Sequence, residues 1–192
     1  MAALCRNRGF DVCICMEKLP NRKPNRLRAY DYSQNGAYFL TVCTEQMRCL
    51  LSTVTADQTP ESARIVLTGI GEAVDQTLRE MNDHYRRIRL DHYTIMPNHV
   101  HLLISIADGE RDGAPRSSPP TNALSCFMTA FKKFSEKACG QKLWQRGFYD
   151  HIIRDDEDYR MHKQYIDENP KKWIMEKDAY YGHETDFVPP KP

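Results

Sequence analysis

The chain has 192 residues, of which 41% are hydrophobic and 28% are charged, and its formal net charge is +1. These values fit one globular domain and exclude a protein that attracts nucleic acid through overall charge alone. No run approaches about 18 apolar residues, and charged side chains such as Arg6 and Asp11 interrupt the N-terminus, so we expect no membrane span and no signal peptide. Seven cysteines without a CxxC pair favour free thiols in a reducing compartment.

The first part of the chain predicts a tail, one strand and a loop. Residues 1–20 show no periodicity and are expected to form a disordered N-terminal tail, although a zinc site at Cys13 and Cys15 stays open. Residues 37–44 are rich in β-branched and aromatic side chains and predict a strand. Residues 45–60 are polar and predict a loop.

The next segment predicts a helix and a hairpin. Apolar residues recur at helical spacing over 69–83, with Thr68 as N-cap and Gly71 as a weak point in the first turn. Residues 88–96 and 99–106 are rich in β-formers, and a Pro-Asn turn separates them. The two segments are therefore predicted to pair as an antiparallel hairpin.

The C-terminal half predicts a loop, two helices and a further strand. Residues 107–121 are rich in Gly, Pro and Ser and predict a flexible loop. Helical spacing returns over 122–138, and residues 144–153 are expected to contain the fourth strand. A last helix is predicted to reach Asn169, because Pro170 disfavours its continuation.

The order β-α-β-β-α-β-α predicts an α+β, ferredoxin-like sandwich. We expect an antiparallel sheet of four to five strands with the helices packed on one face. The predicted domains are a catalytic domain over 21–175, which contains the 107–121 loop, and a C-terminal tail over 176–192.

The strongest chemical signal is the pair His99 and His101. Side chains at i and i+2 of a strand point to the same face, so the two imidazoles project together and Val100 faces the core. Two imidazoles on one face form half of a metal site, which needs at least one further ligand.

The last helix offers that ligand beside a nucleophile. Tyr165 and Asn169 stand four residues apart, one turn along the same helix face. An amide oxygen from Asn169 beside two imidazoles gives a mixed N/O set with open positions, which suits Mg²⁺ or Mn²⁺ bound together with a phosphate. A phenol, whose ordinary pKa is about 10, is a weak nucleophile, but a neighbouring cation favours the phenolate. Tyr159 is the rival nucleophile, but four residues after it stands Lys163, a poor metal ligand.

A metal site beside a tyrosine predicts a nuclease that forms a phosphotyrosine link with the cleaved strand. Two other functions compete with this prediction. A ferredoxin-like sheet can bind nucleic acid without catalysis by stacking bases on strand aromatics, but the chain lacks a recognisable RNP-type aromatic pattern. A zinc hydrolase would instead use His99, His101 and a distant residue such as His151. The alternative for His151 is a structural hydrogen bond.

Basic residues cluster locally although the net charge is near zero, and such patches are candidates to follow a DNA backbone. The candidate DNA contacts are Arg22, Lys23, Arg26, Arg28, Lys132, Lys133 and Arg154.

Three ordered motifs resemble those of the REP-associated tyrosine transposases, in the single-tyrosine HUH transposase superfamily. They are MPNHVHLL at 96–103, WQRGFYDHIIR at 144–154 and YIDENP at 165–170. Residues 30–39 look like the opening of one bacterial branch of that family. The resemblance covers residues 22–181, and residues 1–20 have no counterpart in it.

The resemblance implies that His99, His101 and Asn169 bind Mg²⁺ or Mn²⁺ and that Tyr165 is the nucleophile. It implies cleavage of single-stranded DNA at hairpin-forming repeat elements, with a 5′-phosphotyrosine link, a free 3′-OH and rejoining of strands. It further implies a cytoplasmic, nucleoid-associated bacterial protein that acts as a monomer rather than as a dimer.

Overall fold

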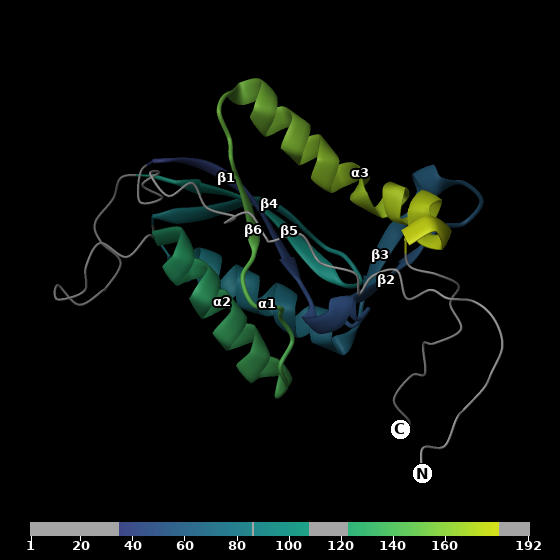
Figure 1. Cartoon of the computed structure of the whole chain (residues 1–192), viewed down its shortest axis with the longest axis horizontal. Helices are drawn as coiled ribbons and strands as arrows, with labels where there is room; N and C mark the ends of the chain where they lie inside the picture. Colours follow the sequence, from purple (N-terminus) through teal and green to yellow (C-terminus); the bar gives the residue numbers. More distant parts are fainter. Residues whose placement is uncertain (1–34, 86, 108–122, 181–192) are drawn as a thin grey trace, which may run out of the picture. The chain divides into compact units, whose positions relative to one another are not determined.

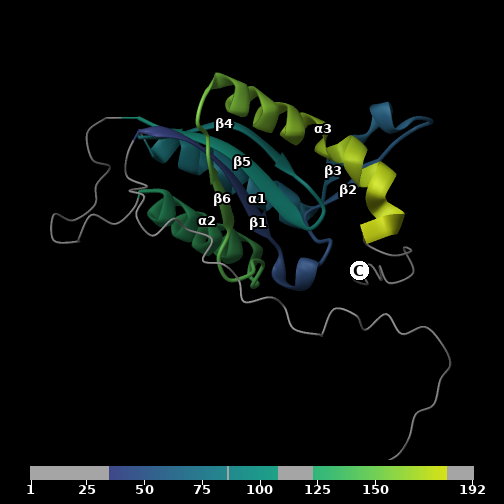
Figure 2. The ribbon, with the colours of Figure 1, turned by 45° about the horizontal axis from the view of Figure 1, so that its top comes forward.

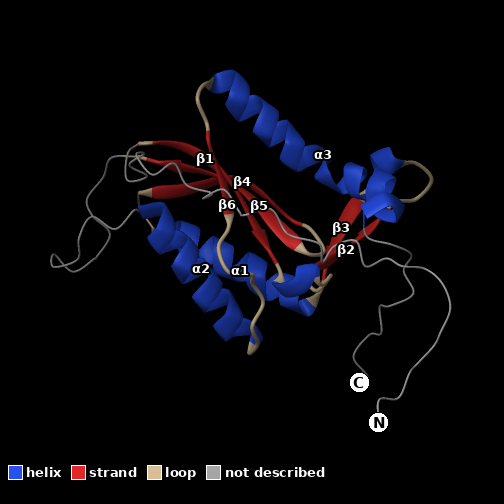
Figure 3. Ribbon diagram, in the orientation of Figure 1, coloured by secondary structure: helices blue, strands red, loops and turns tan. Residues whose placement is uncertain are grey.

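The structure is a computed structural model that describes residues 35–85, 87–107 and 123–180, with side chains as far as Met175. Within these ranges, no helix combines the length and the apolar character that crossing a lipid bilayer requires. The residues predicted as an N-terminal tail, the basic residues at 22–28 and almost all of the predicted 107–121 loop lie outside the description. The elements in chain order (Figures 1 and 3) are β1 (Gly36–Cys43), η2 (Glu45–Met47), β2 (Ser52–Thr55), η3 (Pro60–Ser62), β3 (Arg64–Leu67), α1 (Gly69–His84), β4 (Ile88–Ile95), β5 (His99–Ile106), α2 (Ala123–Cys139), β6 (Tyr149–Ile152) and α3 (Asp156–Tyr180).

Four strands form one antiparallel sheet in the order β4-β5-β1-β6. The first strand therefore lies inside the sheet, between the second arm of the β4–β5 hairpin and the last strand. In this register Cys43 stands opposite His99, and Phe39 stands opposite both Leu103 and His151. The α+β, ferredoxin-like prediction and the predicted hairpin are thereby confirmed.

Helices cover both faces of this sheet, whereas the sequence predicted helices on one face. α1 and α2 pack together below the sheet, and α3 crosses the other face (Figures 1 and 2). The reason is visible in β1, where Tyr38, Phe39 and Leu40 are consecutive and all buried. Consecutive strand residues point to opposite faces, so a strand buried throughout needs cover on both sides.

A second, two-stranded sheet is formed by β2, which lies in the 45–60 segment predicted as loop, and by β3, for which the sequence predicted no element. β2 and β3 pair antiparallel from Ser52 opposite Leu67 to Thr55 opposite Arg64. Each strand has only four residues and little apolar alternation, so the sequence pattern gave no signal. Ser52 fixes the hairpin to the main sheet, because its hydroxyl donates to the Ile95 carbonyl at 2.8 Å.

Thr68 and Gly71, the two residues that the sequence analysis singled out at the start of α1, both shape this end of the helix. Thr68 has the predicted role, and Gly71 has a different one. Thr68 is the N-cap, as predicted, and its Oγ1 accepts a hydrogen bond from the Gly71 N–H at 3.1 Å. Gly71 is not a weak point, because a Cβ at this position would lie 1.9 Å from the Leu51 carbonyl oxygen. The helix therefore approaches the backbone of residue 51 at a distance that only glycine permits.

Gly71→Ala is expected to lower the free energy of unfolding by about 3 kcal/mol, because the clash is with backbone and cannot relax by a side-chain rotation. The matched control is Gly69→Ala in the same turn, where an added Cβ meets nothing within 4 Å. That control should be neutral or stabilising by up to about 1 kcal/mol. Urea denaturation of the two variants measures the difference, and equal stabilities would contradict the close approach.

α3 runs through Pro170 to Tyr180, so the predicted end at Asn169 is wrong, and the helix extends into the segment predicted as a tail. Proline removes one hydrogen bond and bends a helix, and α3 changes direction along its length (Figure 2). Ile166 before the proline and Trp173 after it are both buried. Burial of apolar side chains on both sides of Pro170 offsets the lost hydrogen bond.

Candidate active site

The two histidines of β5 lie on the sheet face that α3 covers. His99 and His101 are 8% and 4% exposed, and their ring centroids are 4.5 Å apart. Val100 between them points to the other face and is fully buried, as predicted. The strand thus presents two adjacent imidazoles beneath the last helix.

α3 brings Tyr165 and Asn169 to this pair. Asn169 is buried, and its side chain forms a hydrogen bond with the His99 ring. The Tyr165 ring stands edge-on to His101 with centroids 5.3 Å apart. Tyr165 is 40% exposed, so its ring reaches solvent while the imidazoles do not. The structure therefore brings all four residues predicted for the catalytic and metal site together.

The position of α3 over the sheet is fixed by apolar packing and by a contact between Asp167 and His92. Ile166 packs against Phe39 of β1 and Leu103 of β5 in a buried cluster. The next residue, Asp167, lies 2.6 Å from the His92 Nε2 of β4. These contacts stand between Tyr165 and Asn169 in the helix, so they hold both side chains over the histidine pair.

Hydrogen bonds to the Nδ1 atoms orient both imidazoles. The Asn98 Oδ1 accepts from the His99 Nδ1 at 2.7 Å, and the Thr41 Oγ1 is 2.9 Å from the His101 Nδ1. When Nδ1 carries the proton, Nε2 keeps its lone pair for a cation. Sequence reasoning did not assign these roles. Thr41 stands opposite His101 only through the β1–β5 register.

Both imidazoles are neutral at physiological pH. Burial lowers the pKa of His99 to about 4, and the hydrogen bond with Asn169 offsets only part of that effect. Burial, together with the charge that His99 carries when protonated, lowers the pKa of His101 well below its ordinary value. A neutral imidazole is the form that binds a metal ion.

Acid should destabilise the metal-free fold through these rings. Between the ordinary His pKa of 6.5 and the folded value of about 4 for His99, the unfolded chain binds a proton that the folded chain does not. Stability is therefore fully present above pH 6.5 and is lost as pH falls towards 4. His99→Gln should reduce that loss by about 3 kcal/mol, measured by urea denaturation in chelator. The exposed-residue control His84→Gln should lose as much stability as the parent, and equal losses in all three proteins would contradict the assignment.

The residues of this site fit a divalent cation. The His101 Nε2 is buried and has no hydrogen-bond partner within the described part of the chain. Such an unsatisfied atom costs about 1–3 kcal/mol, and a coordinated cation would remove that cost. Two neutral imidazoles and an amide side chain supply nitrogen and oxygen donors and no thiolate, a set compatible with Mn²⁺ or Mg²⁺.

Three further side chains that sequence reasoning did not assign to the site surround it. Phe39 stacks on His101 with ring centroids 5.2 Å apart and meets the Tyr165 ring edge-on at 5.8 Å. The Lys172 Nζ lies 4.6 Å from the centre of the Tyr165 ring, which favours one orientation of that ring. Trp173 lies 6.1 Å from the His99 ring. Lys172 and Trp173 follow Tyr165 and Asn169 at helical spacing, a signal that the predicted helix end concealed.

Phe39 could not be predicted from sequence spacing, because its approach to the site depends on the pairing of β1 with β5 and β6.

The rival tyrosine, Tyr159, lies elsewhere on α3. Tyr159 packs against the Phe39–Leu103–Ile166 cluster, and burial and a hydrogen bond to Asp91 raise its pKa. His151, the third ligand of the alternative zinc hydrolase, is bonded to Asp158 of α3. The hydrogen bond with Asp158 is of the structural kind that the sequence analysis gave as the alternative role of His151.

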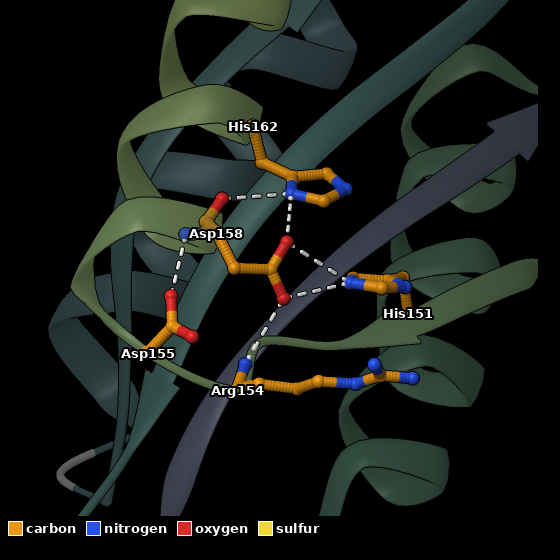
Figure 4. A network of polar contacts seen from close by, with 5 residues as sticks. All are labelled: His151, Arg154, Asp155, Asp158 and His162. Carbon is orange, nitrogen blue, oxygen red and sulfur yellow. Dashed lines mark hydrogen bonds and ion pairs between the residues drawn. The ribbon is translucent and has the colours of Figure 1, made fainter.

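The candidate DNA contacts divide into three groups. Lys132 has a structural role, because its Nζ donates hydrogen bonds to the Gln145 carbonyl at 2.7 Å and to the Gly147 carbonyl. Burial lowers the pKa of this lysine. Lys133 is exposed on α2, and Arg154 follows β6, with its guanidinium extending away from Asp158 (Figure 4). The four basic residues at 22–28 lie outside the described residues.

Comparisons with known proteins show the family to which the chain belongs. A family model described as "Transposase IS200 like" matches residues 59–169, more than half of the chain. An uncharacterized protein of Haemophilus influenzae is 27% identical over 176 residues, 84% of this chain and 93% of the relative. The REP-associated tyrosine transposase of Escherichia coli K12 is 26% identical over 148 residues, 76% of this chain and 73% of the relative.

The fold also matches a solved structure. The REP-associated tyrosine transposase bound to a REP hairpin superposes with a TM-score of 0.53 at 20% identity, over 85% of this chain and 91% of that one. The likeness shows a shared fold, and the family model covers the strand with His99 and His101 and the helix as far as Asn169. The chain therefore belongs to the IS200-like family of transposases.

Proposed function

We propose that this protein is a metal-dependent nicking and joining enzyme for single-stranded DNA that works through Tyr165. The observation that carries the proposal is the exposed Tyr165 ring beside two buried, neutral histidines, one of which has a nitrogen without a hydrogen-bond partner among the described residues. This arrangement supports a nucleophile that substrate can reach, beside side chains that would hold a cation. A non-catalytic binding module has no need of either feature.

The proposed reaction is a transfer of one phosphodiester linkage. The Tyr165 oxygen attacks the phosphorus and forms a new P–O bond, and its proton passes to solvent. The bond to the 3′ oxygen of the preceding nucleotide breaks, and that oxygen keeps the electron pair and takes up a proton as a free 3′-OH. The following strand stays linked to Tyr165 through its 5′ phosphate. Attack by a 3′-OH on this linkage reverses the step and joins strands without an external energy source.

The residues that would hold the cation are His99, His101 and Asn169. A bound Mg²⁺ or Mn²⁺ would polarise the phosphate and neutralise charge that develops on its oxygens. Thr41 and Asn98 keep the imidazoles in the orientation in which each Nε2 is available. The contacts of Ile166 and Asp167 fix the helix, so that Tyr165 approaches from a defined direction.

The relatives support the substrate class. The Escherichia coli relative is named for REP elements, and the matched solved structure contains a REP hairpin. We therefore propose hairpin-forming repeat DNA as the substrate. The enzyme is proposed to act as a monomer, since α3 of one chain can place Tyr165 and Asn169 beside His99 and His101 of that same chain.

The test uses the full chain, a single-stranded DNA hairpin labelled at either end, and Mn²⁺. We expect a denaturation-resistant protein–DNA adduct that carries the 3′-end label, and a released fragment that carries the 5′-end label. Chelator should abolish both products. Cleavage without an adduct would indicate attack by water, and salt-dependent binding without cleavage or metal dependence would indicate a binding module; either result contradicts the proposal.

A further inference from the structure

A second group of metal-ligating side chains lies where β6 meets α3. His151 comes from β6, and Asp158 and His162 come from the first turns of α3. The His151 Nε2 is 2.9 Å from the Asp158 Oδ2, and the His162 Nδ1 is 2.9 Å from the Asp158 Oδ1 (Figure 4). One ligand atom from each residue lies within 4.8 Å of the other two.

The backbone around Asp158 holds this carboxylate in place. The Arg154 N–H donates to the Asp158 Oδ2 at 3.0 Å, and the Asp158 N–H donates to the Asp155 Oδ1 at 2.8 Å. Asp158 is buried, so its position does not depend on a mobile surface rotamer. His162 follows one helical turn later, and its ring stacks on His151 with centroids 4.5 Å apart and an angle of 21°. The donors are therefore organised before any ligand arrives.

We propose that His151, Asp158 and His162 bind a zinc-class transition metal ion. Two imidazole nitrogens and one carboxylate are a common three-ligand set for such ions, with a fourth position left for water or a phosphate oxygen. Tetrahedral coordination at about 2.0–2.1 Å puts ligand atoms about 3.3 Å apart, so small side-chain movements complete the site. Binding needs a lone pair on one nitrogen of each ring, so a neutral imidazole whose proton faces the carboxylate carries that proton on its other ring nitrogen in the bound state.

This cluster is distinct from the site under Tyr165. Phe39 stands between the two, because its ring lies 5.2 Å from His101 and 4.8 Å from His162. The donor sets also differ, since a carboxylate replaces the amide of Asn169. The inference therefore does not rest on the nuclease function proposed above.

The location indicates what the ion would do. It would join β6 to the first turns of α3, three residues before Tyr165 in the chain. A metal bridge between two elements stabilises the folded state by the free energy of binding. The ion would thus hold the N-terminal part of the nucleophile-bearing helix against the sheet.

The experiment is a zinc titration of the full, metal-free chain by calorimetry at neutral pH. Every protein carries His99→Ala and His101→Ala, so that the site under Tyr165 does not contribute. His151→Gln and Asp158→Asn are compared with the control His84→Gln, whose histidine is exposed on α1. Cysteine thiols elsewhere contribute equally to all three. We expect the control to bind one more equivalent of zinc than either test variant.

Two further readings decide the outcome. Zinc should raise the melting temperature of the control and leave that of His151→Gln and Asp158→Asn unchanged, with folding of each variant checked by circular dichroism. Zinc K-edge absorption of the control should show nitrogen and oxygen scatterers at that extra equivalent. Equal zinc stoichiometry in control and variants, or a purely sulfur environment, would overturn the proposal and leave His151, Asp158 and His162 as a hydrogen-bonded network.

Discussion

Tyr165→Phe should form no covalent adduct with hairpin DNA and should lose strand cleavage by at least about 10⁴-fold. The substitution removes one hydroxyl group and leaves the ring, so the contacts with His101, Phe39 and Lys172 are kept. Because Tyr165 is 40% exposed, we expect the loss of its hydroxyl to change the free energy of unfolding little. The fold and the affinity for DNA are therefore expected to stay unchanged while the chemistry disappears.

The matched control is Tyr159→Phe, a tyrosine on the same helix that faces Asp91 and the Phe39 cluster. This variant should keep adduct formation within about threefold of the parent, since its side chain does not adjoin the histidine pair. Gel separation of labelled adducts reports the chemistry, and fluorescence anisotropy of the same DNA reports binding. An adduct in Tyr165→Phe at the level of the parent would assign the nucleophile to another residue.

The fold could be predicted from the sequence where one face of an element carries the apolar residues. The β-forming residues on both sides of the turn at Pro97-Asn98 predicted the β4–β5 hairpin, and the helical spacing predicted α1 and α2 within two residues of their observed bounds. The site followed from the same periodicities. Residues two apart on a strand and four apart on a helix necessarily share a face, which is why His99 and His101, and Tyr165 and Asn169, were found as pairs.

What the sequence could not predict depends on contacts between distant segments. Thr41 meets His101 only because β1 pairs with β5, and no local spacing connects residues 60 positions apart. Gly71 is unfavourable in a helix by propensity alone, but the Leu51 carbonyl beside it leaves no room for a Cβ. Pro170 is tolerated inside α3 because tertiary burial of Ile166 and Trp173 outweighs a local preference. Local rules give the element and its face, and packing decides its length and its partner.

His101→Leu should abolish metal-dependent cleavage without destabilising the metal-free protein. In the folded state the His101 Nε2 is buried and has no hydrogen-bond partner among the described residues. An apolar side chain of similar size removes that unsatisfied atom and keeps contact with Phe39, with which His101 now stacks. We expect the free energy of unfolding in chelator to be unchanged or about 1 kcal/mol higher, and we expect the rise in melting temperature caused by Mn²⁺ to be lost.

This combination separates a metal ligand from a structural histidine, because a structural histidine would show the opposite stability change. If the His101 Nε2 had a partner in the folded protein, its removal would leave that partner unsatisfied and cost about 1–3 kcal/mol. The Thr41 hydroxyl is only partly buried, so it can turn to water when Nδ1 is lost. The control His84→Leu, on the exposed side of α1, should keep cleavage and change stability by less than about 0.5 kcal/mol. A stability loss of several kcal/mol in metal-free His101→Leu would contradict the prediction. A residue that is kept for metal binding is expected to destabilise the folded state, or to leave its stability unchanged, when the cation is absent.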